Sequence, residues 1–161
     1  LERAAARLLE RESSDLPAPR LLYRPSPVDA LAGAEAVATA LAAAAAGERE
    51  RGQPLVGPQR DRVEVEMDEA AARRFASAGE RKLLALALLA ALATLLAEAG
   101  REPIVLLDDL DAELDRPRLA LASRLFGGLP QTVATSSRPE AFERRPDEAR
   151  WSLSDGVLSR A

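Results

Sequence analysis

The distribution of hydrophobic and polar residues defines three segments in the middle of the chain. Leu83–Ala97 is a run of fifteen residues without a charge. As a helix it would measure roughly 22 Å against about 30 Å of bilayer hydrocarbon, so we expect a buried helix and no membrane partner. Arg62–Met67 alternates charged and apolar residues, the period-two pattern of a half-buried strand. Ile104–Leu107 is a continuous apolar run, which is typical of a strand in a buried parallel sheet.

Weaker signals predict the remaining elements. Alanine, the strongest helix former, dominates Val28–Arg51, and Pro117 suits the first turn of a helix that ends near Phe126. The other expected elements are a helix at Leu1–Glu12, a strand at Arg20–Arg24, a turn at Asp68–Ala72, a buried strand at Thr132–Thr135, and a hairpin at Trp151–Leu158 with its tryptophan in the core. A helix followed by a continuous apolar strand predicts an α/β fold with a parallel sheet and flanking helices.

The composition restricts the possible chemistry. The 161 residues are 47% hydrophobic, as in a globular domain, and include neither cysteine nor histidine. This excludes disulfides, zinc sites of the Cys/His type, thiol nucleophiles and catalytic triads that need histidine. The formal net charge of -4 gives no basic excess, so a surface that contacts DNA would have to be local.

Two consecutive acids, Asp108 and Asp109, follow the apolar strand. In open α/β folds the carboxyl ends of the strands form the ligand-binding edge, where a carboxylate can hold Mg²⁺ beside a triphosphate. Asp108 is therefore a candidate metal ligand, and Asp109 is a candidate to orient or deprotonate an attacking water. The same two acids could equally turn the chain and solvate a loop.

The segment Ser77-Ala78-Gly79-Glu80-Arg81 opens the predicted buried helix. The first amides of a helix are unpaired and lie at its positive end, so they can bind an anion, and Gly79 would allow close approach. A structural interpretation stays open as well, because Ser77 and Glu80 also have the spacing of a capping box.

In their order, these motifs resemble the signature motif, Walker B strand and D-loop of an ABC-type ATPase head. More closely, the chain resembles the RecF family, in Pro54–Asp61, Phe75–Arg81 and Leu106–Asp115. The resemblance covers roughly Leu55–Arg160. It implies a C-terminal part of an ABC-type, P-loop NTPase-like head at residues 53–161, preceded by a remnant of a helical lobe, similar to lobe II of RecF, at residues 1–52.

The resemblance also implies a function. Proteins of this family act in the cytoplasm in DNA replication and recombinational repair, where they bind DNA at gaps or single-strand/double-strand junctions with ATP and Mg²⁺. They form an ATP-dependent homodimer and assist recombinase loading through RecR/RecO-like mediator proteins.

Individual roles follow by the same resemblance. Asp108 would hold Mg²⁺, and Asp109 would be the catalytic carboxylate. Ser77 and Gly79 would contact ATP that the other head of the dimer binds, and Asp115 would lie in the D-loop at the dimer seam. The remaining candidate ATP-binding residues are Glu80 and Ser136.

Several positions depart from the family pattern. Gln59 stands where histidine is usual and Arg62 where an acid is common, so we assign no catalytic role to that loop. Ser136 takes the place of a histidine and cannot bear charge, so hydrolysis should be slow. The single lysine, Lys82, has no GxxxxG spacing before it, so these residues contain no P-loop and would form half of a DNA-dependent ATPase, inactive alone.

Two other interpretations stay open. The chain could belong to the head of an SMC-like or RecN-like ATPase, or it could be a non-enzymatic module that docks on a competent partner. Arg138, Arg144, Arg145 and Arg150 could contact DNA phosphates, although a solvated charged loop explains them as well.

Overall fold

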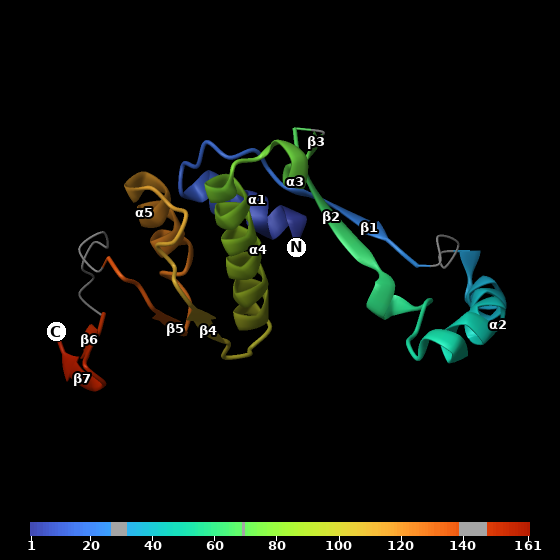
Figure 1. The fold of residues 1–161 in the computed structure, drawn as a ribbon. Helices are drawn as coiled ribbons and strands as arrows, with labels where there is room; N and C mark the ends of the chain where they lie inside the picture. The colour runs from blue at the N-terminus through green and yellow to red at the C-terminus, as the bar shows by residue number, and fades with distance from the viewer. Residues whose placement is uncertain (27–31, 69, 139–147) are drawn as a thin grey trace.

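The molecule has a body of helices and strands that lies between a two-stranded arm on one side and the terminal hairpin on the other (Figure 1). The computed structural model describes residues 1–26, 32–68, 70–138 and 148–161. The body consists of α1 (Glu2–Arg11), α4 (Ala78–Glu98), β4 (Ile104–Leu107), α5 (Arg116–Leu125) and β5 (Gln131–Ala134). The arm contains β1 (Arg20–Arg24), α2 (Ala34–Arg51), the short 3-10 helix η2 (Pro58–Arg60) and β2 (Arg62–Met67).

The core of the body forms around α4, which packs against α1 and α5. Ala87, Ala90 and Ala91 have no exposed surface. Because their side chains are small, neighbouring elements can approach the helix axis closely, and larger residues such as Leu119 fill the space between. The prediction of a buried helix is confirmed, although one side of α4 is partly exposed at Leu89, Leu92 and Leu96.

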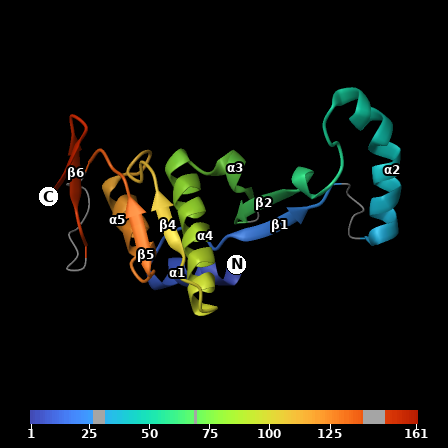
Figure 2. The ribbon, with the colours of Figure 1, turned by 90° about the horizontal axis from the view of Figure 1, so that it is seen from below.

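The parallel sheet predicted from sequence is present as the pair β4 and β5. Ile104 lies opposite Gln131, and Leu107 lies opposite Ala134. The α/β fold is therefore confirmed, and Figure 2 shows the two strands beside α4 and α5. In the described residues β4 is buried on one face only, since Ile104 and Leu106 are 64% and 73% exposed. The expectation of fully buried strands was wrong. Of β4, only Val105 and Leu107 lie in the core with α1, α4 and α5, and β5, predicted as a buried strand at Thr132–Thr135, is exposed except at the partly buried Thr132.

The arm confirms the two strands expected at its ends. β1 pairs antiparallel with β2 along the whole length of β1, from Arg20 opposite Glu66 to Arg24 opposite Arg62. Burial begins only at Val65, because Val63 is 61% exposed, so half of the predicted half-buried strand lies in solvent. α2 begins at Ala34 and has no buried residue, and the first residues of its predicted range fall among residues 27–31, outside the described part.

Two expectations were only partly correct. The turn predicted at Asp68–Ala72 is present at Asp68 but is shorter than expected, because β3 (Ala70–Ala71) pairs with β2 and α3 (Ala72–Phe75) begins at Ala72, which is buried beside Leu84. The hairpin of β6 (Trp151–Ser154) and β7 (Val157–Arg160) forms as predicted. Its Trp151 is 59% exposed and does not pack in the core.

The first 52 residues contribute to both the body and the arm. α1 shares the core with α4, and β1 pairs with β2. A division between residues 52 and 53 stays a prediction. Within the described ranges, the structure has no helix with both the length and the apolar character that a bilayer crossing requires.

Candidate functional site at one end of the body

The first turn of α4 has a complete capping box. The Ser77 hydroxyl accepts a hydrogen bond from the Glu80 amide at 3.3 Å, and the Glu80 carboxylate accepts one from the Ser77 amide at 2.8 Å. The hydrogen bond from the Ser77 backbone is the main reason that the pKa of Glu80 lies below its usual value. The capping box that the spacing of Ser77 and Glu80 allowed is therefore present in the structure.

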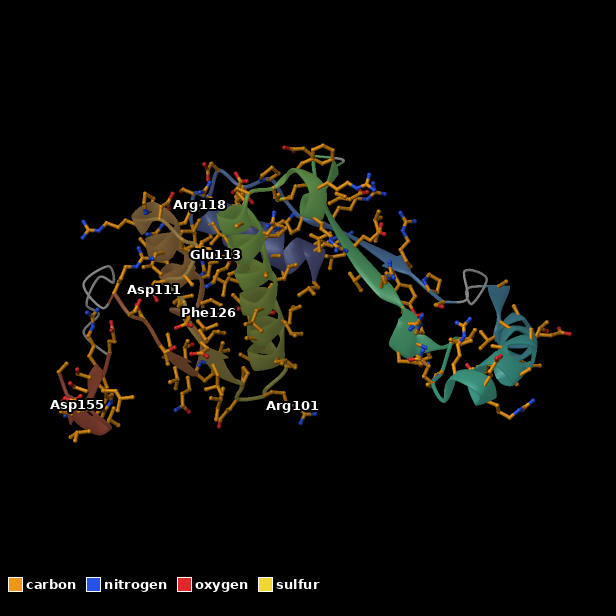
Figure 3. The ribbon with its side chains drawn as sticks, viewed as in Figure 1. Arg101, Asp111, Glu113, Arg118, Phe126 and Asp155 are labelled. Atoms are coloured by element: carbon orange, nitrogen blue, oxygen red, sulfur yellow. The ribbon has the colours of Figure 1, made fainter. Side chains whose placement is uncertain are left out.

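Gly79 brings α4 against the backbone of the loop after β4. A Cβ atom at this position would lie 2.9 Å from the carbonyl oxygen of Glu113, which is closer than carbon and oxygen normally approach. Figure 3 shows Glu113 and Arg118 near the beginning of α4. Only glycine allows this approach. The signature turn (Ser77–Arg81) is therefore packed directly on the segment Glu113–Asp115, where the resemblance predicts the D-loop.

Arg118 connects the two motifs through its guanidinium. It lies 3.5 Å from a Glu80 oxygen and 3.4 Å from an Asp115 oxygen. Asp115 also caps α5 by accepting the Arg118 amide at 2.9 Å. Arg118 was not among the site residues predicted from sequence, although its i,i+3 spacing from Asp115 at a helix start was a detectable signal.

The two acids after β4 are held by a threonine and a lysine. The Thr135 hydroxyl donates to Asp108 Oδ1 at 2.5 Å and accepts the Asp109 amide at 2.9 Å. Lys82 Nζ donates to the Asp109 carbonyl at 2.7 Å, and Asp109 has a left-handed backbone with φ of 46°. Backbone strain of this kind is often found at functional sites.

Asp108 is exposed at the carboxyl end of its strand, as a ligand of a bound ion must be before binding. Among the described residues, no three acidic side chains lie together in a cluster that could hold a metal ion. Mg²⁺ in nucleotide sites typically takes one or two protein carboxylates and completes its shell with phosphate oxygens and water, so a single Asp108 fits that role.

Ser136 lies in the loop after β5, whereas Thr135 makes the contact to Asp108. The Ser136 hydroxyl accepts the Arg138 amide at 3.0 Å. The neighbouring Asp111 is buried and bound by Arg138, with their charged atoms 3.0 Å apart. Hydrogen bonds from the Arg138 guanidinium, aided by Ser136 and Ser137, hold the pKa of Asp111 well below its usual range.

Two of the four arginines considered for DNA contact lie in the described part of the chain, and both form ion pairs with acids of the protein. The Arg138 side chain binds Asp111, and Arg150 forms an ion pair with Glu148 at 2.6 Å. Arg144 and Arg145 lie outside the described residues. Gln59 belongs to η2 in the arm and is not part of this end of the body.

Comparisons with known proteins identify the family. No family model matches the chain. The DNA replication and repair protein RecF of Frankia alni is 37% identical over 139 residues, which are 85% of this chain and 37% of that protein. RecF of Gloeobacter violaceus is 40% identical over 116 residues, which are 70% of this chain and 29% of that protein. This chain belongs to the RecF family. It spans about a third of the length of these relatives.

Two solved structures share the fold. One is described as the recombination mediator protein RecF-ATPrS in the RecFOR pathway, and the other as RecF-ATP in the same pathway. Their TM-scores are 0.65 and 0.61 at 22% identity, and both matches cover 99% of this chain and 43% of the solved chain. The RecF-family chain therefore has the fold of the corresponding part of a RecF protein.

Proposed function

We propose that this chain supplies the signature motif, Walker B strand and D-loop of a RecF-like ATPase head that binds DNA with ATP during replication and recombinational repair. The observation that supports the proposal is the direct packing of the signature turn on the acidic segment, through Gly79 and Glu113 and through the Arg118 contacts. In a head dimer, a surface of this kind would face the nucleotide of the other subunit.

The proposed roles fall on the residues at this end of the body. Asp109 orients or deprotonates the attacking water, while Asp108 helps hold Mg²⁺, which neutralises phosphate charge when bound. Asp115 lies in the D-loop at the dimer seam. The residues that contact ATP are Ser77, Gly79, Glu80 and Ser136. Thr135 and Lys82 keep the two acids in place through the hydrogen bonds described above.

A P-loop from another part of the head would hold the phosphates, because these 161 residues contain none. The chain alone should therefore not hydrolyse ATP. We also propose that the complete head forms an ATP-dependent dimer on gapped or junction DNA in the cytoplasm and meets RecR/RecO-like mediators, as the RecFOR descriptions of the solved relatives suggest.

Catalysis by Asp109 can be tested in a chimera in which this chain replaces the matched segment of Frankia alni RecF. We expect Asp109→Asn to keep ATP-dependent dimers and to lower turnover about a hundredfold, because the amide cannot accept a proton from water. Turnover and dimerisation would be measured on gapped DNA. Asp155→Asn in the terminal hairpin is the matched control and should leave both unchanged (Figure 3).

The results distinguish a catalytic head from a non-enzymatic docking module. Unchanged turnover in the Asp109→Asn chimera would show that this residue has no catalytic role. If the chimera without substitutions binds DNA and dimerises but never hydrolyses ATP, the non-enzymatic docking module is the better description.

A further inference from the structure

The acidic loop, defined as Asp108–Asp115, contains a charged side chain with almost no solvent contact. Asp111 is 3% exposed, and within the described ranges it is the sole charged or polar residue classed with the buried ones. Ser137 donates to its carboxylate from the amide at 3.3 Å and from the hydroxyl at 3.0 Å. A buried carboxylate is stable only when such hydrogen bonds compensate for its lost hydration. The fold therefore requires partners for Asp111, independently of the proposed contacts with a nucleotide.

Arg138 binds the acidic loop at several atoms. Its Nε donates to Asp111 Oδ2 at 3.0 Å, and its Nη2 donates to the carbonyl oxygens of Asp111 and Leu114, the latter at 3.2 Å. A planar guanidinium can serve three acceptors in fixed directions, which the ammonium group of lysine cannot do in the same geometry. Arg138 therefore fixes both the side chain and the backbone of the loop.

The residues after β5 hold the acidic loop at both of its ends. Thr135 binds the beginning, because its carbonyl accepts the Leu110 amide at 3.0 Å and its hydroxyl accepts the Asp109 amide. Arg138 binds the middle and end through Asp111 and Leu114. The proposed catalytic acid and the proposed D-loop are thus both attached to one short segment.

We infer that Arg138 is a positioning residue: through Asp111 and Leu114 it holds the acidic loop in the conformation that presents Asp109 and Asp115 to a nucleotide. The nucleotide part rests on the proposed function, whereas the holding of the loop does not. This role differs from both interpretations of Arg138 that the sequence left open, a contact with DNA phosphates and a solvated charged loop, because the guanidinium binds the protein itself.

The holding of the loop can be tested on the chain itself by amide hydrogen exchange measured with NMR. In Arg138→Gln, protection of the Leu110, Ala112 and Leu114 amides should fall by at least about tenfold, because a charged donor to a buried group is lost. Protection within α4 should change less. Arg101→Gln, near the opposite end of α4, is the matched control and should leave the loop unchanged (Figure 3).

Two further variants keep the inference open to refutation if Arg138→Gln does not fold. Asp111→Asn retains the shape of the side chain and should loosen the same three amides. Arg138→Lys retains the positive charge but lacks the planar guanidinium with its several donors, so it should not restore the protection of these three amides against hydrogen exchange. Unchanged loop protection, or an equal loss in every element, would overturn the inference.

The consequence for catalysis is measured in the chimera. Arg138→Gln should lower kcat at least about tenfold while KM for ATP changes by less than about threefold, since misplaced groups slow chemistry more than binding. A loosened loop with unchanged kcat would contradict the positioning role. A chimera without any turnover would count against the proposed function, and the exchange measurement would still decide whether Arg138 holds the loop.

Discussion

At the scale of single residues, Gly79 illustrates how a signature glycine can be required by packing. Alanine there would place its Cβ 2.9 Å from the Glu113 carbonyl, and backbone cannot move as easily as a side chain. We expect Gly79→Ala to lower the free energy of unfolding by about 1–3 kcal/mol. Gly128→Ala meets no atom within 4 Å and should change it by less than about 0.5 kcal/mol. Urea unfolding of both variants gives the comparison, and equal effects would contradict the close contact.

The pair of Asp111 and Arg138 predicts a pH dependence. Because the pKa of Asp111 is lowered in the folded state, its contribution to stability is complete above the ordinary carboxyl range, near pH 4, and is lost as the pH falls toward the folded value. The stability difference between the parent and Arg138→Gln should therefore be largest at pH 7 and should narrow at pH 3. Urea unfolding of both proteins at pH 7 and at pH 3 measures this stability difference. A difference that is the same at both pH values would argue against the ion pair.

The residues of the site were predictable to different degrees. Asp108 and Asp109 follow an apolar strand, and Ser77 and Glu80 have a local spacing, so a single stretch of sequence reveals each pair. Thr135 and Lys82 could not be found in this way, because they contact the acids from positions 27 residues away along the chain. The Thr135 contact depends on the register of β4 and β5, and the Lys82 contact depends on where α4 lies beside the loop after β4; no local pattern specifies either.

At the scale of elements, α4 depends on small residues where other elements cross it. Ala90 has no exposed surface, so Ala90→Leu should force neighbouring side chains apart and lower the free energy of unfolding by about 1–3 kcal/mol. Ala85 is exposed on the same helix, and Ala85→Leu is the matched control with an expected change of less than about 0.5 kcal/mol. Thermal unfolding of both variants tests the difference, and a tolerated leucine at position 90 would show that the packing is loose.

Most elements were predicted from their own patterns, and the errors have a common cause. The strands at Arg20–Arg24 and Ile104–Leu107 were predicted with their observed limits. The turn expected at residues 68–72 is present at Asp68 but is shorter than predicted, because Ala70 and Ala71 pair with β2 and extend the sheet there. Trp151 was placed in the core from its residue type, but burial depends on whether another element covers it.

At the scale of the whole molecule, two sequence motifs about 30 residues apart in the chain meet at one end of the body. The Gly79 contact and the Arg118 ion pairs join them into one surface. Since the chain spans about a third of its RecF relatives, this surface is proposed to act on ATP bound elsewhere in a larger head. The central claim is that the signature turn works in trans.

That claim is tested most directly by mixing two inactive chimeras of Frankia alni RecF and this chain. One carries Ser77→Arg, which blocks the signature turn, and the other carries a substitution of the P-loop lysine expected in the Frankia alni part. If ATP is held between two heads, mixed dimers regain one complete site, and the account predicts that ATP turnover returns to about a quarter of that of the unsubstituted chimera. Turnover that stays at the level of the separate variants would contradict it.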